Sequence, residues 1–148
     1  MTAATAAAAP TRQDAMRALL QGVAADLVAY RGLLALLERQ FQGAVRHQSA
    51  LLGELAATML AEVEAMEGRR RQRVSLVQQL LGPAGTMMQA FALLKSAARE
   101  RMEADWIALE QLVLECKRLG KRNSDLLVDQ YTIMQRVLHG EEQLYEPA

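Results

Sequence analysis

The sequence predicts an all-α protein: a long antiparallel helical hairpin, then a short helix and a long C-terminal helix, packed as a coiled-coil-like bundle. Aromatic residues make up only 4% of the 148 residues, and there are three prolines. Sheets favour β-branched and aromatic residues, whereas the abundant Leu, Ala, Met, Gln, Glu and Arg are strong helix formers. Apolar residues also recur at alternating steps of three and four, the spacing of helices that pack along their length.

The first helix is predicted over about residues 13–46. Thr11 and Asp14 have the spacing of a capping box, which satisfies free N–H groups of the first turn. Residues 1–12, rich in Ala and closed by Pro10, lack the basic start and Leu-rich stretch of a secretory signal, so we expect a disordered leader there. The apolar positions that then follow the heptad spacing are Met16, Leu20, Val23, Leu27, Tyr30, Leu34, Leu37, Phe41 and Ala44.

The second helix is predicted to follow the break "RHQSA", with Ser49 as its N-cap, and to end at "LGPAG". Gly82 can adopt a left-handed cap and Pro83 cannot continue a helix. The short link predicts that the first two helices are antiparallel neighbours. We interpret the basic run 69–73 as a solvated stretch that pairs with nearby glutamates, in preference to an anion-docking patch. The positions with the heptad rhythm are Leu52, Ala56, Met59, Val63, Met66, Arg70, Arg73, Val77 and Leu80.

The C-terminal region has a wider apolar face than the rest. "MMQAFALLKSAA" predicts a short helix or the entry to a longer one, and the last helix is expected from about Arg101 to His139. Gly140 is expected to end it, which leaves one helical domain over 13–140 and a flexible tail over 141–148. One partner helix would not cover both apolar rows, so part of this face is expected to lack an internal partner. The rows are Leu112, Leu119, Leu126 and Ile133, and beside it Val113, Gly120, Leu127 and Met134.

Several classes of function find no support in the composition. Seventeen basic residues balance seventeen acidic ones, so there is no large positive field for nucleic acid or an anionic membrane. The two histidines and the single Cys116 fall short of a zinc ligand set. No phosphate-binding Gly-rich loop or Gly-x-Ser-x-Gly turn is present. We therefore expect no enzymatic activity, no metal and no cofactor.

The cellular location is expected to be the cytoplasm. Cys116 is the only cysteine, so an internal disulfide is excluded, which suits a reducing compartment. The most apolar region, 19–37, contains Asp26 and Arg31 and is not expected to insert into a membrane.

The C-terminal third resembles the FlgN-type flagellar export chaperones. The stretch is "WIALEQLVLECKRLGKRNSDLLVDQYTIMQRVLHGEEQLYEPA". The family pattern has a Trp, two spaced leucines, often a Cys, an Asn shortly before a Leu pair, and a final Leu-Tyr-Gly. This chain has Ser124 and Glu146 where the pattern has glycine. The matching residues are Trp106, Leu109, Leu112, Cys116, Asn123, Leu126, Leu127, Leu144 and Tyr145.

The resemblance implies a cytosolic type III export chaperone. It would bind the hook–filament junction proteins FlgK and FlgL through its C-terminal helix and deliver them to the export-gate protein FlhA. We expect Trp106, Leu109 and Leu112 to belong to the core. Leu144 and Tyr145 are the candidate export-gate residues. The candidate substrate-binding residues are Leu119, Asn123, Leu126, Leu127, Ile133, Met134 and Val137.

The sequence also allows two other functional hypotheses. One is a structural coiled-coil adaptor, and the other is a type III chaperone for a different cargo. A homo-oligomer that hides the apolar face in the absence of cargo is a further expectation.

Overall fold

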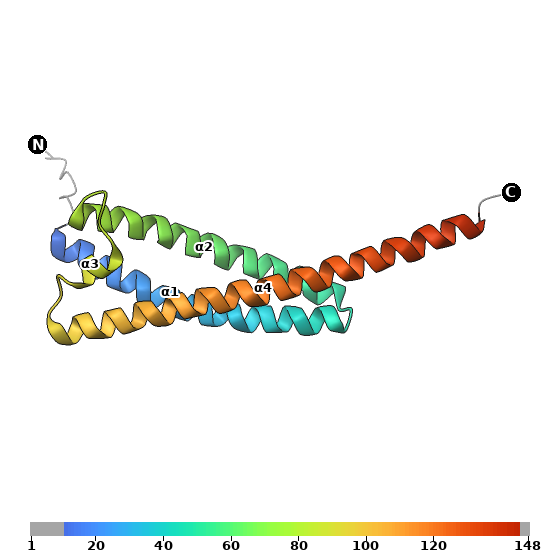
Figure 1. The fold of residues 1–148 in the computed structure, drawn as a ribbon, viewed down its shortest axis with the longest axis horizontal. Coiled ribbons are helices and arrows are strands. Elements are labelled where there is room, and N and C mark those ends of the chain that lie inside the picture. The colour runs from blue at the N-terminus through green and yellow to red at the C-terminus, as the bar shows by residue number, and fades with distance from the viewer. Residues whose placement is uncertain (1–10, 146–148) are drawn as a thin grey trace, which may run out of the picture.

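The computed structural model describes residues 11–145, with their side chains as far as Glu142. Within this range the chain is helical and has no strand, so the predicted all-α fold is confirmed (Figure 1). The helices are α1 (Arg12–Val45), α2 (Ser49–Leu81), α3 (Met87–Phe91) and α4 (Ser96–Tyr145).

Helix α1 is the packing partner of both other long helices. It contacts α2 and α4 equally, whereas α2 and α4 hardly touch each other. The predicted antiparallel hairpin is formed by α1 and α2, and α4 runs beside α1 along most of its length (Figure 1). The body is therefore two helix pairs that share one member.

Most helix ends follow the predicted chemistry. Thr11 Oγ1 accepts a hydrogen bond from the Asp14 amide at 3.1 Å, and the Asp14 carboxylate accepts one from the Thr11 amide at 3.3 Å, which completes the capping box. Gly82 ends α2 with φ at 83°, a conformation that glycine adopts more readily than other residues. The prediction for Ser49 was wrong: Gln48 is the N-cap of α2 and makes no side-chain capping bond, and Ser49 is the first helical residue.

The short helix α3 is a separate element between α2 and α4. A second capping box starts it, because Thr86 Oγ1 accepts from the Gln89 amide at 3.2 Å and Gln89 Oε1 accepts from the Thr86 amide at 3.0 Å. Its Phe91 is fully buried and meets Trp106 of α4 edge-on, with ring centroids 6.3 Å apart. This aromatic pair anchors the link between the hairpin and α4.

Three clusters of buried side chains follow one another along α1. The first joins α1 to the end of α2 and to α3, the second joins α1 to α3 and the start of α4, and the third joins all three long helices. Their buried members are, in that order, Ala15, Leu19, Leu76, Val77, Leu80 and Ala90; Val23, Leu27, Phe91 and Leu109; and Leu33, Leu37, Met66, Cys116 and Leu119.

A buried ion cluster lies on α1 between these apolar clusters. Asp26 is fully buried, and its carboxylate accepts hydrogen bonds from Arg69 Nε and, at 2.6 Å, from Arg73 Nη1. Arg73 also lies over the ring of Trp106, 5.4 Å from its centroid, a cation–π contact that ties α2 to α4. One carboxylate thus connects α1 to two arginines of α2 and, through one of them, to α4.

The prediction of a solvated basic run was therefore wrong for two of its arginines. Arg69 and Arg73 turn toward Asp26 because a buried carboxylate requires hydrogen-bonded counter-charges. The prediction is confirmed for the neighbouring arginines: Arg70 and Arg71 are exposed and pair with Glu67 within the helix at 2.7 and 3.2 Å. The hydrogen bonds from Arg70 lower the pKa of Glu67 to about 2.

Helix α1 is long and apolar enough to cross a membrane, judged by length and composition only, and is alone in this among the helices of residues 11–145. In the fold it is the central helix between α2 and α4, and the buried Asp26 at its middle is matched by two cations of α2. The fold buries 28% of the most apolar window of this helix, and Val28 on its outer side is 70% exposed.

Helix α4 is longer at both ends than predicted. It begins at Ser96 and runs through Gly140 to Tyr145, so the expected end at Gly140 and the flexible tail over 141–145 were wrong. A glycine in a helix costs about 1 kcal/mol relative to Ala but does not stop it, and the residues after Gly140 are helix formers. Residues 146–148, and residues 1–10 of the expected leader, lie outside the described range.

We expect Asp26→Ala to lower the free energy of unfolding by about 2–4 kcal/mol, because it leaves Arg69 and Arg73 partly buried without an anionic partner. Denaturant titration followed by circular dichroism measures the change. Asp125→Ala is the control: it removes an exposed carboxylate that pairs with Lys121 within α4, and should cost less than about 0.5 kcal/mol. Equal effects of the two changes would contradict the structural role of the Asp26 cluster.

Candidate protein-binding face on α4

Helix α4 is longer than α1, the helix on which it packs. At 1.5 Å per residue its 50 residues span about 75 Å, against about 51 Å for the 34 residues of α1. Near the C-terminal end of α1, Gln130 Nε2 donates a hydrogen bond to the Ala44 carbonyl at 2.9 Å. Beyond this point α4 projects past the hairpin (Figure 1). We call residues 131–145 the overhang; it is about 22 Å long.

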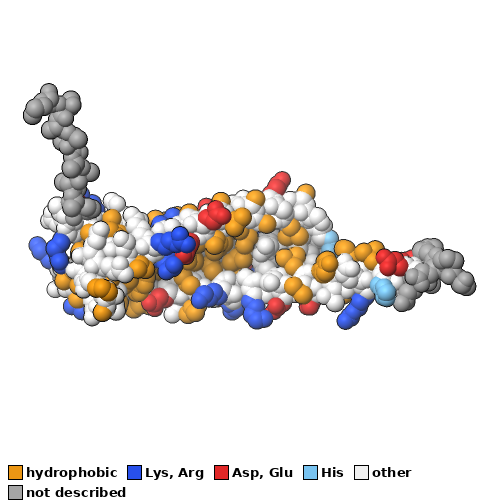
Figure 2. Space-filling view, turned by 90° about the horizontal axis from the view of Figure 1, so that it is seen from above, with side chains coloured by type: hydrophobic (Ala, Val, Ile, Leu, Met, Phe, Trp, Pro, Cys, Tyr) orange, Lys and Arg blue, Asp and Glu red, His pale blue; other side chains and the backbone are white. Residues whose placement is uncertain are grey.

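The overhang and the turn before it carry large apolar side chains that are more than half exposed. Figure 2 shows hydrophobic side chains along this projecting part of the molecule. Tyr131, Met134 and Leu138 form one row and Ile133 and Val137 a second row beside it, so these five share one broad side of the helix, with Val128 at its edge. Asp129, Arg136 and His139 lie on the opposite side. An exposed apolar face of this kind is a candidate interaction site. We call this set the distal face: Val128, Tyr131, Ile133, Met134, Val137 and Leu138.

Two of the predicted substrate-binding residues are internal, which corrects that part of the prediction. Leu119 is only 4% exposed and packs with Leu33 and Leu37 of α1. Asn123 is 1% exposed, and its Nδ2 donates to the Leu37 carbonyl at 2.7 Å and to Gln40 Oε1 at 2.8 Å. Both continue the stripe of α4 that faces α1, so neither is available to a partner in this fold.

The remaining candidates lie at or beyond the point where α4 leaves the body. Leu126 and Leu127 are half-buried there. Ile133, Met134 and Val137 are each 59% exposed, as a partner-binding role requires. The helical backbone of α4 includes the candidate gate residues Leu144 and Tyr145, whose side chains lie outside the described ones. Trp106, Leu109 and Leu112 pack in the core as predicted.

The candidate substrate-binding residues predicted from the sequence did not include Val128, Tyr131 and Leu138. The spacing of Tyr131, Met134 and Leu138 by three and four could have indicated them, because these steps place residues on one side of a helix. The prediction was based on two rows of residues seven apart, which ended at Ile133 and Met134.

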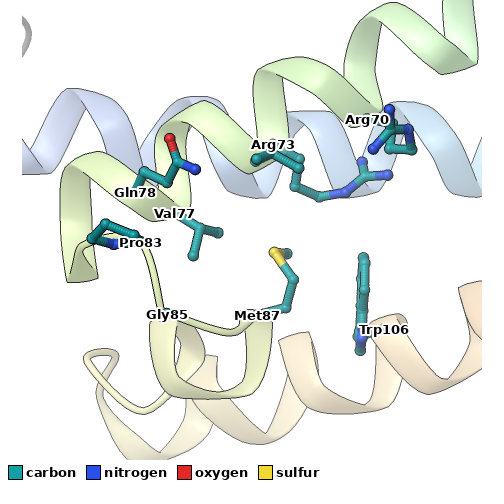
Figure 3. Close-up of a pocket in the computed structure, with 9 residues that line it drawn as sticks. Arg70, Arg73, Val77, Gln78, Pro83, Gly85, Met87 and Trp106 are labelled. Atoms are coloured by element: carbon teal, nitrogen blue, oxygen red, sulfur yellow. The ribbon is translucent and has the colours of Figure 1, made fainter.

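Three separate clefts lie along the boundary between α2 and α4. Near α3 is a cleft of about 280 Å³, into which Met87 and Trp106 point from one side and Arg73 from the other (Figure 3). Further along lies a cleft of about 340 Å³ beside Trp106 and Val113. A third, of about 500 Å³, lies next to the overhang and is lined by Leu37, Gln40, Met59, Gly120, Ser124, Leu127, Val128 and Tyr131.

Two titratable side chains between α1 and α4, Cys116 and Tyr30, have raised pKa values. Burial, with a smaller contribution from Glu115, raises the pKa of the Cys116 thiol to about 11, and its Sγ lies 3.7 Å from the Tyr30 carbonyl. A thiol with this pKa is almost entirely protonated at neutral pH and is a poor nucleophile. Burial, and then the charge of Asp26, raises the pKa of Tyr30. Residues 11–142 bring no three His, Cys, Asp or Glu side chains together as metal ligands.

Comparison with known proteins adds no relative: no family model, no curated protein and no solved structure matches the chain. Function is therefore inferred from the residues and from their geometry.

We expect Leu119→Ala to lower the free energy of unfolding by about 2–4 kcal/mol, since it opens a cavity among the three long helices. Val137→Ala removes a comparable apolar side chain from the overhang and should cost less than about 0.5 kcal/mol. Denaturant titration of both variants measures the difference. A large cost for Val137→Ala would mean that the distal face is part of the core.

Proposed function

We propose that this protein is a FlgN-type export chaperone in the cytoplasm. It binds the hook–filament junction subunits FlgK and FlgL through the distal face of α4, keeps them unassembled, and delivers them to the export-gate protein FlhA. The observation that carries the proposal is the unpartnered apolar overhang of α4. It coincides with the part of the sequence in which the resemblance to this family lies.

The geometry favours a helical partner segment. The distal face is the apolar side of a regular helix, and such a face pairs with an amphipathic helix of another chain. Burial of a large apolar side chain contributes about 1.5–3 kcal/mol, so a few such contacts offset the cost of ordering a partner. The terminal segments of junction subunits form helices on assembly and would supply such a partner.

We assign capture to fewer residues than the sequence alone suggested. Leu119 and Asn123 hold α4 on α1 and so position the overhang. Capture falls to the half-buried Leu126 and Leu127 at the base, and to the distal face beyond them.

Gate binding is assigned to Leu144 and Tyr145 at the end of the overhang. Because α4 stays helical to Tyr145, this pair stands some 22 Å from the hairpin, clear of the body. A tyrosine suits an anchoring role, because its ring buries a large area with few rotatable bonds and its hydroxyl can hydrogen-bond.

We expect Ile133→Glu with Val137→Glu to weaken FlgK binding at least about 100-fold, since two apolar contacts become buried charges. Isothermal titration with purified FlgK measures this, and FlgL is tested in parallel. The matched control is Val28→Glu with Ile107→Glu, two exposed apolar positions on α1 and the body portion of α4, which should leave binding unchanged.

Two results would decide against the proposal. Undiminished FlgK binding by the overhang variant would move capture elsewhere on the chain. If the unaltered protein binds neither FlgK nor FlgL, the choice lies between a chaperone for another type III cargo and a structural coiled-coil adaptor.

We expect Tyr145→Ala to weaken binding to the cytosolic domain of FlhA about tenfold or more while FlgK binding is kept, since the anchor ring is lost beyond the capture face. Surface plasmon resonance with immobilised FlhA domain measures the first property. Tyr131→Ala is the control for gate binding, because Tyr131 is also an exposed tyrosine on α4 but lies at the start of the overhang, far from Tyr145. Unchanged FlhA affinity of Tyr145→Ala would remove the end of α4 from the delivery step.

A further inference from the structure

We propose that the cleft of about 280 Å³ near α3, which we call the Trp106 cleft, is a second binding site for an acidic linear segment of a partner protein. One large apolar side chain of the segment enters the cleft, and a neighbouring carboxylate meets Arg70 and Arg73. The inference goes beyond the proposed function, because this cleft lies at the α3 end of the body and the overhang projects from the other end (Figure 1).

The walls of the Trp106 cleft are largely apolar. Val77 of α2, Met87 of α3 and Trp106 of α4 line it together (Figure 3). Val74 of α2 also lines it and is 47% exposed. The flexible thioether of Met87 adapts to side chains of different shape. The volume is just below the usual range of small-molecule sites, so the cleft suits one large side chain.

The cleft is formed before any partner binds. In the turn after α2, the Gly85 amide donates to the Gly82 carbonyl at 3.1 Å. A Cβ added at Gly85 would lie 2.6 Å from Leu81 Cβ and 3.1 Å from Val77 Cγ1, so glycine lets this turn pack directly on α2. The fully buried Phe91 holds the Trp106 ring edge-on. A site that is already ordered costs less to fill.

The charge beside the cleft is positive. Four arginines within residues 69–73 pair with only two carboxylates, Asp26 and Glu67, so two positive charges are unmatched there. Arg70 and Arg73 line the cleft, and no Asp or Glu is among its lining residues. An anionic group next to the apolar one would therefore complement this site.

Both arginines keep donors for a carboxylate. Arg70 binds Glu67 through Nε and Nη2, so its Nη1 takes part in neither bond. Arg73 donates to Asp26 through Nη1 at 2.6 Å, which leaves its Nε and Nη2. A guanidinium has five N–H donors in a planar fork that matches a carboxylate. The Arg70 side chain is 56% exposed and that of Arg73 is 14% exposed, so Arg70 makes the main contact.

The two neighbouring clefts lack this combination. The cleft of about 340 Å³ has Glu110 beside Arg73, so its cation already has an anionic neighbour. The cleft of about 500 Å³ next to the overhang has no charged residue among those that line it. Of the three, the Trp106 cleft is thus the one that joins apolar walls to unmatched cations.

The Trp106 cleft and the distal face can be occupied at the same time. At 1.5 Å per residue, α4 separates Trp106 from Tyr131, at the start of the overhang, by about 37 Å. A partner at one site therefore does not block the other, and the chain can hold two different proteins at its two ends.

The test is titration of the full chain with the peptide Gly-Ser-Glu-Leu-Glu-Ser-Gly, followed by tryptophan fluorescence and by the indole N–H signal in NMR spectra. Trp106 is the only tryptophan, so both signals report on this cleft. We expect a Kd of about 1 mM or tighter, from one apolar side chain and charge-assisted hydrogen bonds. Matched peptides with Gln for both Glu residues, or with Ala for Leu, should bind at least about tenfold more weakly.

Two pairs of variants separate the charge from the apolar wall. Arg70→Gln should weaken peptide binding about tenfold or more, whereas Arg71→Gln should change it less than about twofold, because both arginines pair with Glu67 but only Arg70 lines the cleft. Val74→Gln should weaken binding about threefold or more, and Val63→Gln should not. These two valines of α2 are 47% and 48% exposed, and only Val74 lines the cleft.

No response of either signal at about 10 mM peptide would overturn the proposal, and so would equal effects within either pair of variants. Binding to phosphatidylglycerol vesicles that Arg70→Gln abolishes, without peptide binding, would overturn it in favour of a membrane surface. Ile133→Glu with Val137→Glu should leave peptide binding unchanged, so a failure to bind FlgK leaves this inference intact, and a failure to bind the peptide leaves the proposed function intact.

Discussion

The length of α1 is the constraint on which the rest of the structure depends. Apart from their contacts with the short α3, α2 and α4 pack mainly on α1, so its 34 residues limit how much of α4 the chain can cover. Helix α4 keeps an apolar stripe past the point where α1 turns into α2. The overhang is thus a direct consequence of the difference in length between α4 and the helix on which it packs.

The Asp26 cluster fixes how α2 lies on this shared helix. Apolar heptads alone tolerate a slip along the helix axis, because one Leu or Ala fits much like another. A buried carboxylate does not tolerate it, since a slip of one turn would separate Asp26 from Arg69 and Arg73 and leave a charge without a partner. Asn123 acts in the same way between α4 and α1 through the Leu37 carbonyl. Polar contacts therefore set the register, and the apolar clusters supply most of the stabilisation.

The sequence predicted the features that depend on neighbouring residues and not those that depend on residues far apart in the chain. Local patterns gave the helices, the Thr11 capping box and the Gly82 stop correctly, because these depend on neighbouring residues. The pairing of Asp26 with arginines more than 40 residues away was not predictable from spacing, since nothing local distinguishes a solvated arginine from one that meets a buried carboxylate.

The candidate binding face was likewise predictable only where it depends on local sequence. That α4 carries excess apolar surface was visible as two rows, but the point where burial ends depends on where α1 ends in space. The periodicity of Leu119 and Asn123 therefore looked no different from that of Ile133 and Val137, although the first pair is buried and the second exposed. The prediction that Gly140 ends the helix was wrong because a glycine by itself only weakens a helix. A glycine ends a helix when its backbone adopts a positive φ, as Gly82 does and Gly140 does not.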